Sequence, residues 1–204
     1  STQEFQGQKL RATEEFNIMM RQATGIAKAP YVAEFVRMLV ESGESVMLYG
    51  WHRDVYNIWL ERLAEFNPVM YTGTEGPAAK ELSKQAFLND ESKVFISSLR
   101  SSAGLDGLQY HSKCKTFVFG ELDWSPGVHD QCIGRLDRDG QIKQISAYYL
   151  LADSGSDPII SDVLGIKKGQ LEGVKNPNGE LFEHLITDGG GICLLYTSDA
   201  ADDM

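Results

Sequence analysis

The chain has 204 residues, of which 42% are hydrophobic and 10% aromatic, and its 29 acidic side chains outnumber 19 basic ones to give a formal net charge of -10. This length suits one well-packed domain, and this composition excludes a globally disordered or fibrous protein. The acidic balance argues against a broad basic surface for nucleic acid, because phosphates are contacted mainly by Lys and Arg, so any such contact has to come from motifs.

The positions of cysteine, histidine and apolar residues narrow further the class of protein to which the chain can belong. Cys114, Cys132 and Cys193 are too widely separated for a disulfide framework or a zinc site, and the 4 His residues are equally scattered. No apolar run approaches the roughly 18 residues that cross a bilayer, and the first residues lack a basic or apolar leader pattern. We therefore expect a cytoplasmic protein of a bacterial or phage-infected cell, with no membrane partner and no metal held by this chain alone.

The N-terminal part predicts two helices separated by a break. Residues 4–22 have apolar residues at helical spacing, and we interpret residues 1–24 as a lead-in helix from a missing N-terminal lobe. After Gly25 and Pro30, residues 31–41 again show helical spacing, and Gly43 is a natural C-terminal stop.

From residue 45 onward, predicted strands and helices alternate. Short apolar runs predict strands over residues 45–50, 68–73, 93–98, 115–120 and 144–152. Helical spacing predicts helices over residues 54–66, 77–89, 125–139 and 158–164. The alternation predicts one α/β domain over residues 25–166, with a parallel sheet covered on both faces, followed by a polar extension over 167–191.

The last residues, ICLLYTSDAADDM, differ in character from everything before them. We interpret residues 192–204 as a non-native tail that is dispensable and poorly ordered. The alternative is a short native hydrophobic strand followed by an acidic tail.

Distinctive loops follow the predicted strands. They cover residues 49–53, 71–76, 98–107 and 120–127. Because ligands of open parallel sheets bind outside the carboxyl ends of the strands, we expect these loops to line one edge and to form the candidate site.

The helix predicted over residues 125–139 has clear ends and a polar face. Ser125 suits the N-cap, Pro126 suits the first helical position, and Gly140 can end the helix. Helical spacing puts three polar side chains on one face, beside an apolar stripe of Val128, Cys132 and Leu136: Gln131, Arg135 and Arg138.

Two rigidly presented guanidiniums suit a transferring phosphoryl group, because Arg binds phosphate oxygens in a forked geometry. The alternative is a solvated helix whose arginines are merely neutralised by the neighbouring acids Asp130, Asp137 and Asp139.

The segment WSPGVHDQCIGRLDRDGQ resembles motif VI of superfamily-2 helicases, especially the Swi/Snf-like form, in which a W-x-P element leads into Q-x-x-x-R-x-x-R-x-G-Q. Upstream, SLRSSAGLDGLQ resembles motif V, and earlier segments resemble the lead-in, motif IV and the following turn, so the resemblance covers about residues 21–152. Two acids depart from the family pattern, Asp106 in motif V and Asp137 in motif VI.

The resemblance implies a RecA-like three-layer domain with a central parallel sheet, as the single C-terminal lobe of a two-lobe motor that acts on DNA in its duplex form. The chain has no G-x-x-x-x-G-K-[ST] loop and no D-E-x-[HD] segment. ATP with Mg²⁺ would therefore be held mainly by the missing N-terminal lobe, and we expect the chain alone to have no ATPase activity.

The resemblance also implies roles for residues at the predicted edge. The catalytic residues would be Arg135, Arg138 and Gln131. The nucleotide-binding residues would be Gly104, Asp106, Gly107 and Gln141. The DNA-binding residues would be Ser98, Arg100, Ser101, Ser102, Trp51 and His52.

Two other functions stay open from the sequence. One is a non-catalytic nucleic-acid-binding or interaction module. The other is an unrelated nucleotide-using transferase domain, which would bind a sugar nucleotide at the same edge and would not respond to DNA. A Walker-type lobe encoded directly upstream would support the motor.

Overall fold

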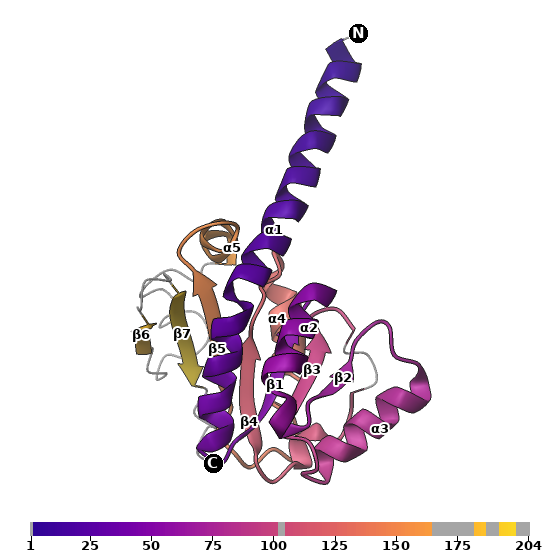
Figure 1. Cartoon of the computed structure of the whole chain (residues 1–204), viewed down its shortest axis with the longest axis vertical. Helices are drawn as coiled ribbons and strands as arrows, with labels where there is room; N and C mark the ends of the chain where they lie inside the picture. Colours follow the sequence, from indigo (N-terminus) through magenta and orange to yellow (C-terminus); the bar gives the residue numbers. More distant parts are fainter. Residues whose placement is uncertain (1, 102–104, 165–181, 187–191, 199–204) are drawn as a thin grey trace.

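The computed structural model describes residues 2–101, 105–164, 182–186 and 192–198 (Figure 1). Its centre is a sheet of seven strands in the order β2-β3-β1-β4-β5-β7-β6. The strands are β1 Ser45–Gly50, β2 Val69–Tyr71, β3 Val94–Ser98, β4 Cys114–Phe119, β5 Ser146–Ala152, β6 Phe182–Ile186 and β7 Ile192–Ser198. The first five pair in parallel, β7 is antiparallel to β5, and β6 is antiparallel to β7.

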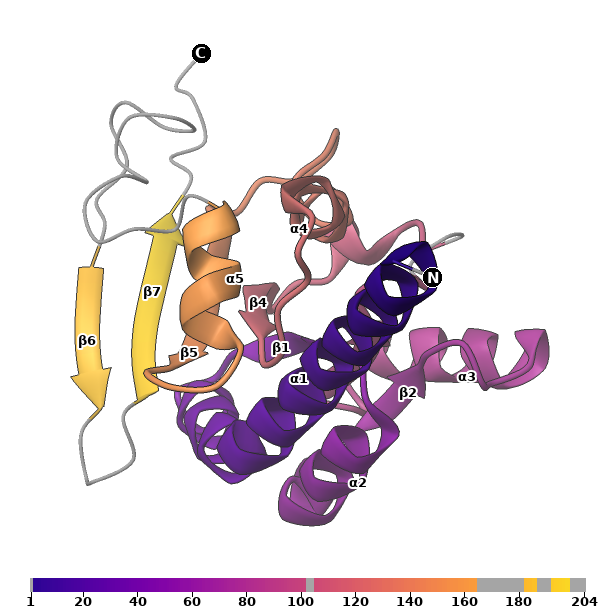
Figure 2. The same ribbon diagram turned by 90° about the horizontal axis from the view of Figure 1, so that it is seen from above.

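Helices cover both faces of the parallel strands, as predicted. They are α1 Thr2–Glu41, α2 Arg53–Arg62, α3 Pro77–Leu88, α4 Pro126–Ile133 and α5 Asp157–Leu164, with short 3-10 turns η1 Ala64–Phe66 and η2 Leu108–Tyr110. Figure 2 shows α1 and α2 on one side of β1 and β4, and α4 on the other. None of the described helices has the length and apolar composition that a membrane span requires.

The alternation of β1 side chains explains the two layers. Val46 and Leu48 pack with α1 and α2, whereas Met47 and Tyr49 pack toward α3 and α4, because successive side chains of a strand point to opposite faces. All four side chains are fully buried. The run SVMLYG is therefore apolar at nearly every position, as is typical of a parallel strand covered on both sides.

The prediction of two N-terminal helices was wrong, because α1 runs without interruption through Gly25 and Pro30. Proline removes one helical hydrogen bond, but the neighbouring residues Ala29, Val32 and Val36 are fully buried against the sheet. Tertiary packing thus outweighs the local preference for a break. The other half of α1 extends away from the sheet and exposes large apolar side chains such as Phe16 and Met19 (Figure 1).

Part of the C-terminal segment forms a strand, and the expectation that this segment is poorly ordered and dispensable stays a prediction. Residues Ile192–Ser198 form β7, which pairs with β5 along Ser146–Ala152. This matches the alternative of a short hydrophobic strand, while the non-native origin of the segment stays a prediction. Residues 165–181, which hold much of the predicted polar extension, and residues 199–204 lie outside the described residues.

A buried ion pair connects α1 to the far end of the parallel sheet. Lys28 is 2% exposed, and its Nζ donates to Asp157 Oδ2 at 2.6 Å and to the carbonyl oxygen of Leu150 at 2.8 Å. Asp157 Oδ2 also accepts the backbone N–H of Ala152 at 2.9 Å. A charge this deeply buried is tolerated because each partner is hydrogen-bonded.

We predict that Lys28→Met lowers the free energy of unfolding by about 3–5 kcal/mol, because it leaves the buried Asp157 carboxylate without its cation. The matched control is Lys113→Met, whose ammonium also lies 2.6 Å from a carboxylate, that of Asp90, but whose side chain is 51% exposed. Removal of this exposed pair should cost less than about 1 kcal/mol. Equal losses for the two variants in urea unfolding would contradict a structural role for the buried pair.

Candidate functional site

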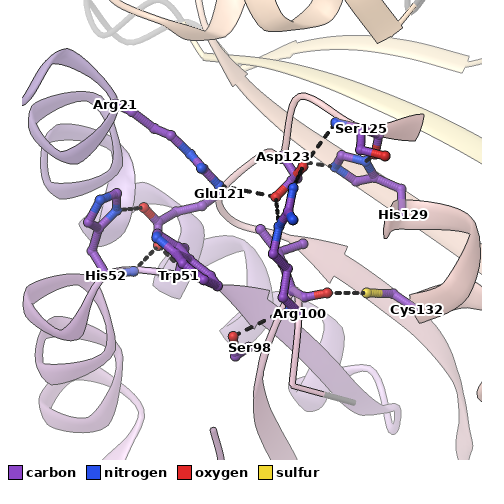
Figure 3. A network of polar contacts seen from close by, with 11 residues as sticks. Arg21, Trp51, His52, Ser98, Arg100, Glu121, Asp123, Ser125, His129 and Cys132 are labelled. Carbon is purple, nitrogen blue, oxygen red and sulfur yellow. Dashed lines mark hydrogen bonds and ion pairs between the residues drawn. The ribbon is translucent and has the colours of Figure 1, made fainter. Parts of the chain in front are cut away.

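The loops that leave four parallel strands meet at the carboxyl edge of the sheet, as predicted. Trp51 and His52 follow β1, and Thr72 follows β2. Ser98 and Arg100 lie at the end of β3 and just beyond it. The loop after β4 carries two acids, Glu121 and Asp123, at the centre of the polar network that Figure 3 shows.

Glu121 fixes the loop that follows β1. The residue is 2% exposed, and its Oε2 accepts the backbone N–H groups of Trp51 at 2.6 Å and His52 at 2.9 Å. Its Oε1 lies 2.6 Å from Nδ1 of His52. Burial acts to raise the pKa of Glu121, but the hydrogen bonds from His52 and from the two backbone N–H groups outweigh burial and lower it. The carboxylate therefore stays ionised and holds the loop.

Asp123 fixes the loop that follows β3. Its Oδ2 and Oδ1 accept Nε and Nη2 of Arg100, both at 2.9 Å, in a forked pair, and Oδ1 also accepts the backbone N–H of Ser125 at 2.9 Å. Burial acts to raise the pKa of Asp123, but the bonds from Arg100 and Ser125 outweigh it and lower the pKa. The same carboxylate thus joins the loop after β3 to the start of α4.

His129 extends this network into α4. Its Nε2 accepts the backbone N–H of Asp123 at 3.3 Å, and its Nδ1 lies 3.1 Å from the carbonyl oxygen of Ser125. This arrangement fits a neutral ring with the proton on Nδ1. Burial lowers the pKa of His129, which favours the same neutral form.

Arg21 reaches the network from α1. Its guanidinium carbon lies 5.8 Å from the centre of the Trp51 ring, and its Nη2 lies 3.8 Å from Asp123 Oδ2. Burial lowers the pKa of Arg21, and the nearby Asp123 and Glu121 oppose that shift. Sequence reasoning missed Arg21, Glu121 and Asp123. The presence of two acids in a strand-exit loop directly before motif VI was the one available indication.

The helix that carries motif VI is shorter than predicted. It spans Pro126–Ile133, with Pro126 in its first turn as expected, but Ser125 makes no side-chain cap hydrogen bond. The helix ends at Gly134, a residue of poor helix propensity, so Gln131, Arg135 and Arg138 do not share one helical face. The apolar stripe does form, because Cys132 and Leu136 are fully buried and Val128 packs against them.

The two motif VI arginines occupy different environments. Arg138 Nη1 lies 2.8 Å from Asp106 Oδ1, in a pair whose side chains are 38% and 70% exposed. Arg135 is half-buried, and its Nε has no hydrogen-bond partner among the described residues. Burial raises the pKa of Tyr49 and of Tyr71, and the positive charge of Arg135 opposes both shifts.

The other predicted site residues lie in turns or on α4, or they lie outside the described residues. Gln141 donates from Nε2 to the carbonyl oxygen of Leu136 at 3.1 Å and accepts the N–H of Lys143 at 3.0 Å. Gly107 has a φ of 89°, which a glycine adopts without strain. Gln131 is exposed on α4. The predicted residues Ser102 and Gly104 lie outside the described residues.

The structure thus brings the predicted residues together as two neighbouring groups. One contains Trp51, His52, Ser98, Arg100 and Ser101, and the other contains the ion pair of Arg138 with Asp106. Within the described part of the chain, no group of three or more His, Cys, Asp and Glu residues is arranged to hold a metal ion.

Comparison with known proteins identifies relatives that share this region. The chain is 29% identical over 156 residues to a SWI/SNF-related matrix-associated actin-dependent regulator of chromatin subfamily A-like protein 1 from Bos taurus, which covers 73% of this chain and 16% of the relative. The Xenopus laevis protein of the same name is 31% identical over 137 residues, or 66% of this chain and 14% of the relative. The human DNA annealing helicase and endonuclease ZRANB3 is 26% identical over 159 residues, or 76% of this chain and 14% of the relative.

A solved structure of the C-terminal part of the Fun30 ATPase domain superposes with a TM-score of 0.58 at 16% identity, over 66% of this chain and 43% of that chain. This match concerns the fold. No family model matches the chain. The chain spans about a sixth or less of the length of the three relatives described above.

Gly25 permits the close approach of α1 to Glu121. A Cβ atom at Gly25 would overlap Glu121 Oε1 and lie 3.0 Å from its Cδ, and the buried carboxylate has no room to move away. We predict that Gly25→Ala lowers the free energy of unfolding by about 1–3 kcal/mol through this overpacking.

The control for this prediction lies in the same helix. A Cβ at Gly7 would meet nothing within 4 Å, so Gly7→Ala should raise the free energy of unfolding by up to about 1 kcal/mol or leave it unchanged. If thermal or urea unfolding gave both variants the same sign, the contact of α1 with Glu121 would not constrain residue 25.

Proposed function

Because the chain belongs to the Swi/Snf-like branch of superfamily-2 helicases, as a C-terminal RecA-like domain, we propose that it forms the second lobe of an ATP-driven motor that moves on duplex DNA. The observation that carries the proposal is the loop after β4, which lies at the carboxyl edge of the sheet. There, one loop with two buried carboxylates holds the predicted DNA contacts and leads directly into the motif VI arginines.

On the nucleotide side, Arg138 can exchange its present carboxylate partner for a phosphoryl group. Its present partner, Asp106, is 70% exposed, and an exposed ion pair contributes no more than about 1 kcal/mol. A phosphoryl group in transfer carries more charge than one carboxylate and accepts a forked guanidinium, so it would displace Asp106. Arg135, whose Nε has no partner among the described residues, would supply a second donor, and Gln131 would support them.

On the DNA side, Arg100 is presented at a fixed angle. Its Nε and Nη2 are bonded to buried Asp123, while Nη1 makes no bond in this pair and the side chain remains 55% exposed. Nη1 can therefore donate to a backbone phosphate without a change of rotamer, and Ser101 lies on the same loop, just beyond Ser98 at the end of β3. A few fixed donors of this kind suit a narrow track on a chain whose net charge is -10.

The cofactor would be ATP with Mg²⁺, bound mainly by an N-terminal lobe that carries the phosphate loop. When bound, the nucleotide would supply the phosphoryl group whose transfer drives movement. This chain would contribute Arg135 and Arg138 across the cleft between the lobes, together with Gly107, which follows Asp106, and Gln141, which bonds to the carbonyl of Leu136.

We predict that Arg138→Ala, in a protein that contains both lobes, slows ATP turnover by about 10³-fold, because an arginine finger acts on charge that develops in the transition state. Nucleotide and DNA affinity should change much less. Arg138→Lys should not restore turnover, because a point charge cannot make the forked contact. Single-turnover hydrolysis with saturating duplex DNA measures the effect.

The control is Lys115→Ala, since Lys115 is exposed near the amino end of β4, away from the carboxyl edge. Its turnover should match the parent protein. If Arg138→Ala also kept near-normal turnover, Arg138 would be a solvated partner of Asp106 and the proposed catalytic role would fail.

A further inference from the structure

A cleft of about 410 Å³ opens between α2 and the carboxyl ends of β2 and β3. Its apolar lining comes from Trp51, Tyr56, Leu60 and Met70. Its polar lining includes the hydroxyls of Thr72, Thr74, Ser98 and Ser101. This volume lies within the roughly 300–1,000 Å³ that is usual for small-ligand sites, and the combination of aromatic surface with a few polar groups is typical of them.

We propose that this cleft receives an unpaired nucleobase of DNA, stacked on Trp51, so that the domain prefers DNA that contains an unpaired nucleotide to an uninterrupted duplex. The inference rests on the proposed DNA-binding function and specifies the kind of DNA. A base that remains paired and stacked inside a duplex cannot enter a cleft, whereas an unpaired base can turn outward at small cost.

Trp51 is held as a rigid platform. Its backbone N–H is bonded to buried Glu121 at 2.6 Å, and the Arg21 guanidinium lies 5.8 Å from the ring centre. The residue is nevertheless 41% exposed and lines the cleft. A preformed aromatic surface of this kind strengthens binding of a stacked base by about 5- to 150-fold.

The two charges of the cleft lining are of opposite sign, which suits a neutral base. Arg53 and Glu75 are the charged residues of the lining. Glu75 Oε2 accepts the backbone N–H and the hydroxyl of Thr72, both at 2.6 Å, and Oε1 accepts the hydroxyl of Thr74 at 3.1 Å. Burial acts to raise the pKa of Glu75, but the bonds from Thr72 and Thr74 outweigh it and lower the pKa, so the carboxylate stays ionised and offsets the positive charge of Arg53.

Glu75 also indicates which base fits. A carboxylate oxygen accepts more than one hydrogen bond, so Oε1 can take a second donor beside Thr74. The exocyclic amino group of cytosine offers two N–H donors to such an oxygen, whereas thymine has no amino group and offers only its ring N3–H. We therefore expect an unpaired cytosine to bind more tightly than an unpaired thymine.

The test is equilibrium binding of the full chain to a short labelled duplex and to the same duplex with one extra, unpaired cytosine. We expect the bulged DNA to bind at least about 5-fold more tightly, and Trp51→Leu to remove that preference. Tyr110→Leu is the matched control, because Tyr110 is an aromatic residue that is 70% exposed and lies outside the cleft, so the preference should persist. Glu75→Gln should reduce the preference for a cytosine bulge over a thymine bulge.

A second measurement needs no variant. The fluorescent base analogue 2-aminopurine, placed in the bulge, should be quenched when the parent chain binds, because quenching reports stacking on an aromatic ring. An unquenched signal at saturation would overturn the inference even if Trp51→Leu failed to fold.

Other outcomes separate the two proposals. Equal affinity for intact and bulged duplex would overturn the base-insertion cleft and leave the proposed DNA-binding function standing. Failure to bind either DNA would overturn both. Displacement of bulged DNA by free ATP would assign the cleft to a soluble nucleotide and would also overturn the inference.

Discussion

The buried carboxylates of Glu121 and Asp123 constrain three segments of the candidate site: the loops after β1 and β3 and the first turn of α4. Moving an ionised carboxylate out of water costs free energy unless hydrogen-bond donors surround it. Other segments of the chain supply such donors to both carboxylates. Backbone N–H groups of Trp51 and His52 converge on Glu121, while Arg100 and the N–H of Ser125 converge on Asp123. The loops after β1 and β3 and the first turn of α4 therefore cannot shift independently.

This constraint gives the proposed motor a physical link between its two sides. The segments expected to contact DNA are bonded to a loop that continues directly into the helix before Arg135 and Arg138. A DNA phosphate bound to Arg100 would act on Asp123 through its hydrogen bonds and, through Asp123, on the start of α4. The same bonds explain how an acidic chain can offer cationic contacts, because Asp123 orients Arg100 without covering it.

The sequence predicted the parallel sheet well, since buried parallel strands are short apolar runs bounded by turns, and each observed parallel strand lies within two residues of its predicted range. Prediction from the sequence failed where contacts between residues far apart in the chain determine the structure. Pro30 is retained inside α1 because the sheet buries its neighbours, and the motif VI helix stops at Gly134 while Leu136 stays in the core. No local pattern could show that Glu121 is buried, because its donors lie about 70 residues away.

The most direct test of this account is native-state hydrogen exchange of the Trp51, His52 and Ser125 amides in the unmodified chain. If buried carboxylates hold these loops, the three amides should exchange only with the slow openings that expose β1 and β4. Exchange as fast as that of the exposed loop over residues 73–76 would show that the loops move freely. The two sides of the site would then be uncoupled, contrary to the account.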